Sequence, residues 1–227
     1  MAQQLELRRY PRLIAHRNRQ LKPQGQVNTP QQTREIGCLA KSVDPQLALA
    51  RTLLTVGDRK TNVVLTGFMA TGKSTVGRLL AVRRDASYLD TDEIIVERHG
   101  SIEEIFAAQG EAAFRKMERD IASELEETSG LVIATGGRMM LDPDCAQSLG
   151  STGRVICLTA SIEEIKRRLL SDEDQLVRPL LMDFSEAELR LLYEERVAGY
   201  SKFQQVHTDQ KSVEAVVREI ETLLRND

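Results

Sequence analysis

The feature that most constrains the fold of this chain is a glycine-rich loop, Gly-x-x-x-x-Gly-Lys-Ser, at residues 67–74. Four residues of strand character precede the loop, and a segment with helical apolar spacing follows it. Gly67 and Gly72 allow the backbone to turn so that successive N–H groups point at one anion. The start of the following helix adds unsatisfied N–H groups and a positive dipole end. The loop therefore predicts a nucleotide-binding protein.

The side chains of the loop have separate expected roles. Lys73 is placed to reach the β- and γ-phosphates, and the Ser74 hydroxyl is placed to ligate Mg²⁺. The alternative interpretation is an ordinary glycine turn before a helix. We expect the nucleotide to contact Gly67, Ala70, Thr71, Gly72, Lys73, Ser74 and Thr75.

Composition limits the possible partners. The 227-residue chain has a formal net charge of −3, and aromatic residues make up 4% of it, with no tryptophan. Neither a general attraction for nucleic acid nor aromatic platforms for bases are expected from these values. We therefore expect no nucleic-acid partner. No apolar run approaches the ~18 residues of a membrane span, so we expect no membrane partner either. Three scattered cysteines without a Cys-x-x-Cys pair favour a reducing compartment, and we expect a cytoplasmic protein.

Residues 1–60 differ from the rest of the chain. They are rich in arginine with few acids, and no apolar period is sustained before Leu47, which predicts a poorly ordered basic extension. An organelle transit peptide or an arm for an anionic partner are the alternatives, although transit peptides are usually rich in serine and the first serine is Ser42. A short helix at 44–55 is expected to lead into a domain at 61–227.

From residue 61 onward, strand-like and helical segments alternate. Short apolar runs without a polar alternation are typical of buried parallel strands. The expected strands are 63–66, 86–90, 131–134, 154–159 and 205–207. The expected helices are 73–84, 92–99, 101–109, 111–127, 142–149, 161–170, 185–198 and 212–224. This order predicts an α/β fold of three αβα layers, with a central parallel sheet of about five strands and helices on both faces. The charged stretch 171–183 is expected to be a mobile lid.

Three candidate groups follow strands, where ligands of such folds gather. Asp90 is suited to hold Mg²⁺ through water, and Asp92 to accept or orient a substrate hydroxyl. Gly136 and Gly137 would let a substrate approach the backbone closely. Arg178, in the expected lid, would close over phosphates. The structural alternatives are a turn with an N-cap aspartate, a plain glycine turn and a solvated loop arginine.

Two further arginines are ambiguous from their spacing. Arg115 lies one turn after Glu111, and this spacing is also explained by an ordinary i,i+4 ion pair on the surface. Arg196 follows Glu194 and Glu195 and is equally consistent with a solvated side chain.

Taken together, these stretches resemble the shikimate kinase family from residue 62 to 224. The resemblance rests on residues 67–78, 89–92, 110–118, 134–137, 178–180 and 193–196, in the family's order. The phosphate loop alone is generic. The Asp-Thr-Asp, the Phe-Arg after Gly-Glu and the Gly-Gly are fairly specific in combination.

The resemblance implies a P-loop kinase fold and ATP-dependent phosphorylation of the 3-hydroxyl of shikimate, a small cyclic triol carboxylate. It implies that Arg115 and Arg196 hold the carboxylate. Asp92 would hold the hydroxyls, and Gly136 and Gly137 the ring.

On the nucleotide side, the resemblance implies that Ser74 and Asp90 hold Mg²⁺ and that Lys211 lies near the adenine. The lid arginine, Arg178, would close over ATP. Lys73, Asp92 and Arg178 are the expected catalytic residues.

The sequence departs from the family's usual pattern at two places, both on the substrate side. Arg138 stands where a third glycine is usual, and residues 197–200 read Val-Ala-Gly-Tyr where Pro-Leu-Tyr usually follows the arginine. The alternative functions are a kinase of the same fold for another small hydroxy acid and a nucleotide-binding regulatory module without turnover. A monomer is expected in each case.

Overall fold

The computed structural model describes residues 61–171 and 185–225. The expected basic extension at 1–60, its short helix at 44–55 and the lid arginine Arg178 lie outside these residues. No helix of the described part is long and apolar enough to cross a membrane.

The core of the fold is a five-stranded sheet in the order β2-β3-β1-β4-β5, and every pairing in it is parallel. The strands are β1 Asn62–Thr66, β2 Ser87–Asp90, β3 Leu131–Ala134, β4 Gly153–Thr159 and β5 Gln204–His207. The central strand β1 pairs with β3 on one side and β4 on the other, and all five of its residues are buried. This burial on both faces explains why β1 shows no polar alternation in the sequence.

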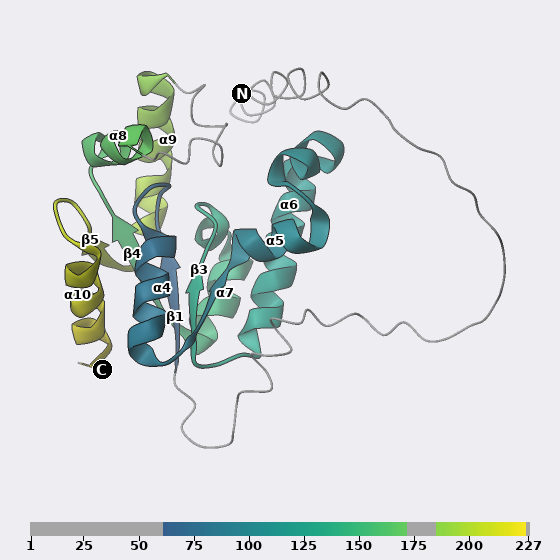
Figure 1. Ribbon diagram of the computed structural model, residues 1–227. Helices are drawn as coiled ribbons and strands as arrows, with labels where there is room; N and C mark the ends of the chain where they lie inside the picture. The colour runs from purple at the N-terminus through teal and green to yellow at the C-terminus, as the bar shows by residue number, and fades with distance from the viewer. Residues whose placement is uncertain (1–60, 172–184, 226–227) are drawn as a thin grey trace, which may run out of the picture. The chain divides into compact units, whose positions relative to one another are not determined.

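Helices cover both faces of this sheet, as Figure 1 shows. They are α4 Lys73–Arg84, α5 Thr91–His99, α6 Ile102–Glu126, α7 Pro143–Thr152, α8 Ile162–Ser171, α9 Glu186–Tyr200 and α10 Val213–Arg225, with a short 3-10 turn, η1 Met139–Leu141. On one face, Leu80 of α4 and Val217 of α10 pack against Val63 and Leu65 of β1. This arrangement confirms the expected three-layer αβα fold.

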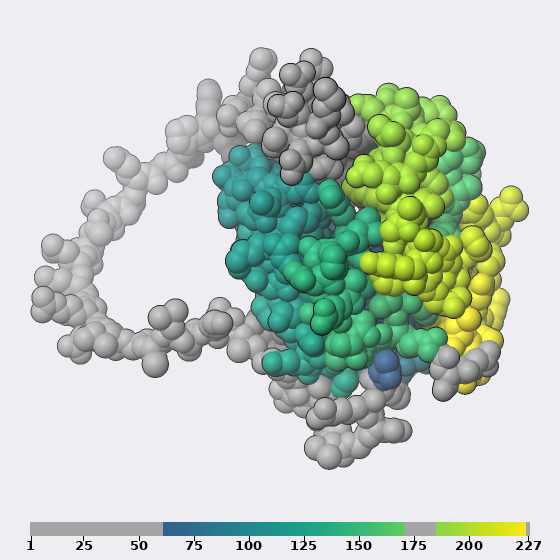
Figure 2. All heavy atoms as spheres, turned by 180° about the vertical axis from the view of Figure 1, so that it is seen from behind, coloured from purple at the N-terminus to yellow at the C-terminus, as the bar shows by residue number. Residues whose placement is uncertain are grey.

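The opposite face has its own hydrophobic cluster. It joins Cys157 of β4 to Ile165 of α8 and to Leu189 and Leu192 of α9. Seen from this side, the yellow-green α9 lies beside the green segment that carries η1 and α7 (Figure 2), and α9 contacts η1. The cluster therefore fixes α9 over the strand ends, where the phosphate loop begins.

The helix boundaries follow local capping signals. Ser101 and Glu104 form the expected capping box at the start of α6, and a second box, Ser185 with Glu188, opens α9. Gly110 has a φ of 78° and a ψ of 174°, which are not helical. The interruption expected between 101–109 and 111–127 is therefore confirmed, and it forms a kink within α6.

Two features of the segment between β3 and β4 were not predicted. The helix α7 continues to Thr152 rather than ending at Leu149, and η1 was not predicted. A three-residue turn carries no periodic pattern, because it is shorter than one period of an α-helix.

Candidate functional site

The candidate site lies at the carboxyl ends of β1, β2 and β3. The phosphate loop between β1 and α4 needs unusual backbone angles, with φ of 133° at Gly67, 57° at Ala70 and 94° at Gly72. A side chain at Gly67 would also collide with the carbonyl oxygen of Leu158 on β4. The sheet thus packs so closely under the loop that glycine is required there.

Lys73 lies on the inside of this loop. Its ammonium group donates to the carbonyl oxygens of Gly67, at 2.9 Å, and Phe68, at 3.0 Å. The Thr71 hydroxyl donates to the Phe68 carbonyl at 2.8 Å, which closes the loop on itself. The loop is therefore a preformed cradle of N–H groups with one cation in it, suited to bind phosphate.

Asp90, at the end of β2, is held by hydrogen bonds from three directions. The Ser74 hydroxyl donates to Oδ2 at 3.0 Å, and the Tyr88 hydroxyl donates to the same oxygen at 3.1 Å. The other oxygen, Oδ1, accepts the N–H of Asp92 at 3.1 Å and so caps α5. The alternative reading of Asp90 as a helix N-cap is confirmed. The same carboxylate contacts the phosphate loop through Ser74, and its role toward Mg²⁺ stays a prediction.

The chemistry of this pair fits Mg²⁺. Within 61–171 and 185–225, no group of three or more His, Cys, Asp or Glu side chains gathers as a metal site. A hydroxyl and a single carboxylate beside a phosphate loop are instead the sparse oxygen ligands with which proteins bind Mg²⁺ jointly with a nucleotide's phosphates. Ser74 and Asp90 could hold such an ion, whereas a dedicated protein cage is not formed.

Asp92 is the most perturbed carboxylate in the site. Burial, together with the negative charges of Asp90 and Glu118, raises the pKa of Asp92 to about 7. Its Oδ1 atom is buried and has no hydrogen-bond partner among the described residues. An unpaired buried carboxylate oxygen lowers the stability of the folded chain. A carboxylate kept in such a position is typical of a functional site in which a ligand provides the missing hydrogen bond.

Arg115, on α6, is paired with two carboxylates. It donates to Glu118 at 2.6 Å and to Glu111 at 3.0 Å. Burial lowers the pKa of the Arg115 guanidinium, but the two carboxylates outweigh burial and the pKa is raised. The i,i+4 pair with Glu111 exists as expected, but Arg115 is only 21% exposed and also pairs with the buried Glu118, so it is not a fully solvated surface arginine. Sequence reasoning gave Glu118 no role, although its spacing of three residues from Arg115 was the signal.

The two-glycine turn after β3 brings α9 to the same place. A β carbon at Gly137 would lie 3.8 Å from Nη1 of Arg196, and the Tyr200 hydroxyl donates to the Gly137 carbonyl. Arg196 also stacks over Phe68, with 5.7 Å from its Cζ to the ring centroid. The Arg196 side chain therefore faces the phosphate loop and the glycine turn. Tyr200, one of the residues that depart from the family's pattern, is what ties α9 to this turn.

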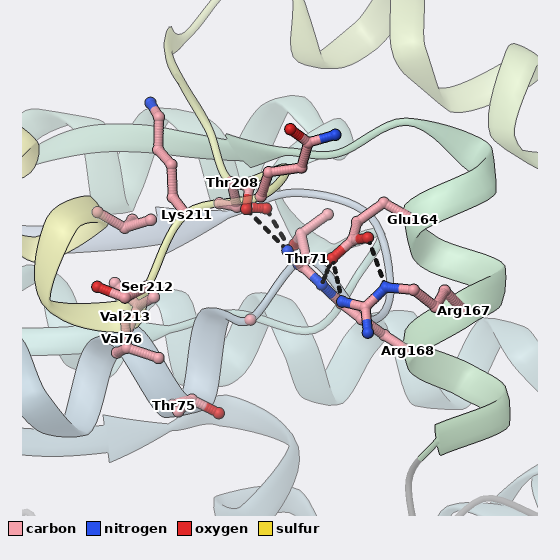
Figure 3. Close-up of a pocket in the computed structure, with 13 residues that line it drawn as sticks. Thr71, Thr75, Val76, Glu164, Arg167, Arg168, Thr208, Lys211, Ser212 and Val213 are labelled. Carbon is pink, nitrogen blue, oxygen red and sulfur yellow. Dashed lines mark hydrogen bonds and ion pairs between the residues drawn. The ribbon is translucent and has the colours of Figure 1, made fainter.

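A pocket of about 500 Å³ lies on the other side of the phosphate loop (Figure 3). It is lined by Thr71 and Gly72 of the loop, by Arg168 of α8 and by Thr208 and Lys211 after β5. Lys211 thus lines a pocket next to the phosphate loop, and its place near the adenine stays a prediction. The Lys211 ammonium pairs with Glu219 at 2.5 Å.

Arg168 was missed from the sequence. Its guanidinium donates to the Ala70 carbonyl at 3.1 Å, and to the Thr208 hydroxyl and carbonyl at 3.0 and 2.8 Å. It thereby joins α8, the phosphate loop and the segment after β5 around the pocket. An arginine in the last turn of an amphipathic helix has no distinctive sequence signal, because such residues usually face solvent.

The structure thus brings together Lys73, Ser74, Asp90 and Asp92 with Gly136, Gly137, Arg115 and Arg196, and places Lys211 in the adjoining pocket. A preformed phosphate cradle next to a buried carboxylate and two arginines defines a P-loop kinase fold with a site for a small acidic molecule.

Comparison with known proteins identifies the family. A family model described as shikimate kinase matches residues 69–225. The shikimate kinase of Geobacter sulfurreducens is 46% identical over 167 residues, covering 72% of this chain and 91% of that protein. That of Geobacter metallireducens is 44% identical over 162 residues, covering 70% of this chain and 89% of that protein. This chain belongs to the shikimate kinase family.

Solved structures agree with this assignment. A shikimate kinase from Acinetobacter baumannii in complex with shikimate superposes with a TM-score of 0.66 at 29% identity. The match covers 80% of this chain and 98% of that chain. A shikimate kinase from Bacteroides thetaiotaomicron gives a TM-score of 0.65 at 30% identity, covering 73% of this chain and 98% of that chain.

Proposed function

We propose that this chain transfers the γ-phosphoryl group of ATP to the 3-hydroxyl of shikimate. Besides membership of the family, one observation carries the proposal. The unpaired Oδ1 of Asp92 is buried beside the charges of Lys73, from the phosphate loop, and Arg115. We call the group formed by Asp92, Arg115, Gly136, Gly137 and Arg196 the acid pocket. A hydroxyl acceptor between the phosphate loop and the acid pocket is what phosphoryl transfer to a hydroxy acid requires.

On the ATP side, the N–H groups of the phosphate loop and Lys73 would hold the β- and γ-phosphates. The pocket lined by Arg168 and Lys211 would hold the nucleoside. Ser74 and Asp90 would hold Mg²⁺, which neutralises phosphate charge when it is bound. Arg178 remains a proposed lid residue that closes over the phosphates.

On the substrate side, Arg115 and Arg196 would bind the carboxylate, because guanidinium groups match planar carboxylates in a forked geometry. Gly136 and Gly137 form a wall without side chains against which the ring would lie. Asp92 would accept a hydrogen bond from the 3-hydroxyl and hold its oxygen in line with the γ-phosphorus.

The bonds and charges balance with these groups alone. The 3-oxygen forms a bond to the γ-phosphorus while the bond from that phosphorus to the bridging oxygen of ADP breaks. The proton of the 3-hydroxyl passes to Asp92 and then to solvent. A pKa near 7 suits this role, since the carboxylate can take the proton and release it near neutral pH.

An ADP-release assay tests the proposal directly. The purified chain is incubated with ATP–Mg²⁺ and either shikimate, gluconate or no acceptor, and ADP is measured by a coupled reaction. Shikimate-dependent ADP release, abolished in Asp92→Asn, is the expected result. ATP binding without shikimate turnover would contradict the proposal and turn attention to other hydroxy acids. No observation here favours those acids or a regulatory module.

We also propose that the chain acts as a cytoplasmic monomer without a nucleic-acid or membrane partner. The phosphate loop, Asp92 and Arg115 lie together within a single folded chain, which supports a monomer as a sufficient unit. Light scattering after size-exclusion chromatography should give the monomer mass in active fractions, and activity confined to a larger species would contradict this.

A further inference from the structure

One carboxylate oxygen in the acid pocket accepts hydrogen bonds from two guanidinium groups. Oε1 of Glu111 lies 3.0 Å from Nε of Arg115 and 3.0 Å from Nη1 of Arg138. The Glu111 and Arg138 side chains are 30% and 38% exposed, so the shared ion pair is only partly screened by water. Oε1 of Glu111 therefore links Arg138 to Arg115, the arginine that we assign to the substrate carboxylate.

The charges around Arg115 show what Arg138 contributes. Removal of Arg138 would take one positive charge away from Glu111, so more of the Glu111 charge would act on Arg115. Glu118 is nearly completely buried and keeps its 2.6 Å contact with Arg115. The surroundings of Arg115 would then be more negative, and a carboxylate from a substrate would be bound less strongly.

The backbone holds Arg138 in place for this purpose. Arg138 directly follows Gly137 and precedes Met139, which is completely buried. The Met139 N–H donates to the Gly136 carbonyl at 3.2 Å, and the Leu141 N–H donates to the Arg138 carbonyl at 2.9 Å. These bonds hold the backbone of Arg138 beside the glycine turn, and the ion pair with Glu111 holds its side chain near Arg115.

We propose that Arg138 is a positioning residue that shares the charge of Glu111 and so leaves Arg115 able to bind the carboxylate of the substrate. Through Glu111 it makes the pocket selective for acids over neutral polyols. This inference rests on the proposed function and deepens it.

A double-mutant cycle on Arg138 and Glu111 tests the inference. Arg138→Met removes the charge and keeps much of the length, and Glu111→Gln removes the shared charge. Calorimetry should show shikimate affinity reduced about 10-fold in Arg138→Met, since coupled ion-pair neighbours interact by 0.5–3 kcal/mol. ATP affinity and kcat should change less than about twofold, and Arg138→Lys should recover most of the loss. In the Glu111→Gln background, Arg138→Met should change shikimate affinity by less than about twofold.

Arg119→Met is the matched control. Arg119 is also 38% exposed and pairs with Asp142 at 2.9 Å, but it contacts neither Glu111 nor Arg115 in the ion pairs of the described residues. Its loss should leave shikimate affinity unchanged. A large effect of Arg138→Met that persists in the Glu111→Gln background would overturn the inference, because it would mean that Arg138 acts without Glu111. Unchanged affinity in Arg138→Met would overturn it as well.

A second readout separates this inference from the proposed function. The Arg115 Nε–H signal in ¹⁵N spectra reports its bond to Glu111 without any substrate. Arg138→Met should shift this signal and slow its exchange with solvent, and Arg119→Met should not. If the unmodified chain fails to bind shikimate, the proposed function fails, and an unmoved Arg115 signal would in addition overturn the coupling.

Discussion

Gly136 lies directly against Asp92. A β carbon on Gly136 would lie 2.5 Å from Oδ1 of Asp92 and 3.2 Å from Oε1 of Glu118. Since the contact falls on the buried oxygen that we assign to the substrate hydroxyl, any side chain at 136 must displace the Asp92 carboxylate. Glycine is therefore required at position 136 because the Asp92 carboxylate leaves no space for a side chain. The backbone angles do not require it, because the φ of Gly136 is not positive.

Gly136→Ala should therefore lower kcat for shikimate phosphorylation about 100-fold, because a displacement of about 1 Å at a reacting group has a cost of this size. Nucleotide affinity should change little, since the atoms nearest to a β carbon at position 136 belong to Asp92 and Glu118 and not to the phosphate loop. Steady-state kinetics and titration with a fluorescent ADP analogue check these values.

The control for this substitution is Gly150→Ala. Gly150 lies within α7, and a β carbon there would only touch Val155 at 4.0 Å. Alanine is the better helix former by about 1 kcal/mol, so this variant should be fully active and slightly more stable. Equal activity of both alanine variants would refute the assigned role of Asp92.

The raised pKa of Asp92 predicts a specific dependence of stability on pH. In the absence of Mg²⁺ and nucleotide, the carboxyl is protonated below about pH 7 in the folded chain and only below its ordinary value of 3.8 in the unfolded chain. The folded state thus binds more protons between these values, and its stability falls as the pH rises from about 4 to 7.

Asp92→Asn removes this effect. The variant should gain stability on the order of 1–4 kcal/mol at pH 8, and close to nothing at pH 3, where Asp92 is neutral in both the folded and the unfolded chain. Urea unfolding at both pH values measures the difference. In the unmodified enzyme, kcat/KM should fall on the acid side with an apparent pKa near 7. A gain of the same size at both pH values would show that burial of the charge is not the cause.

Much of the fold was accessible from the sequence because its signals are local. The run 63–66 lacks polar alternation because β1 is buried on both faces, and Ser101 with Glu104 marks a helix start through their own hydrogen bonds. The strand order was not accessible, since it depends on which partner each strand finds in the folded sheet. The inner strands β1 and β3 are buried throughout and the edge strands β2 and β5 only in part, but neither pattern specifies which strand pairs with which.

The same division applies to the site. The phosphate loop and the Asp-Thr-Asp stretch are short motifs, so their roles follow from spacing. Arg168 and the shared oxygen of Glu111 depend on contacts between segments far apart in the chain, such as the bond from Arg168 to Ala70. Their partners are set by tertiary packing, which no local spacing encodes.

The ion pair of Arg115 and Glu118 predicts that stability and binding can be separated. Arg115→Ala would leave Glu118 buried without its cation, and breaking such a pair costs about 3 kcal/mol. Thermal unfolding should show a lower Tm, and the KM for shikimate should rise far more than the KM for ATP.

Arg115→Met combined with Glu118→Gln should recover most of that stability, because no buried charge is then left unpaired. Shikimate binding should not recover, since the guanidinium is still missing. If the double variant regained shikimate affinity, the assignment of Arg115 to the carboxylate would be wrong.

Arg168 predicts a nucleotide defect without a shikimate defect. Arg168→Met removes the bonds to Ala70 and Thr208 that hold α8 and the segment after β5 at the phosphate loop. Bonds from a charged donor contribute about 1.5–3 kcal/mol, so ADP affinity should fall by about 10-fold or more, while shikimate affinity should stay within about twofold.

Arg190→Met is the matched control, because Arg190 makes only exposed ion pairs, with Glu163 and Glu186, among the described contacts. Titration with a fluorescent ADP analogue distinguishes the two variants. Equal losses of ADP and shikimate affinity in Arg168→Met would mean that Arg168 supports the whole site, and that the pocket in Figure 3 is not specific to the nucleotide.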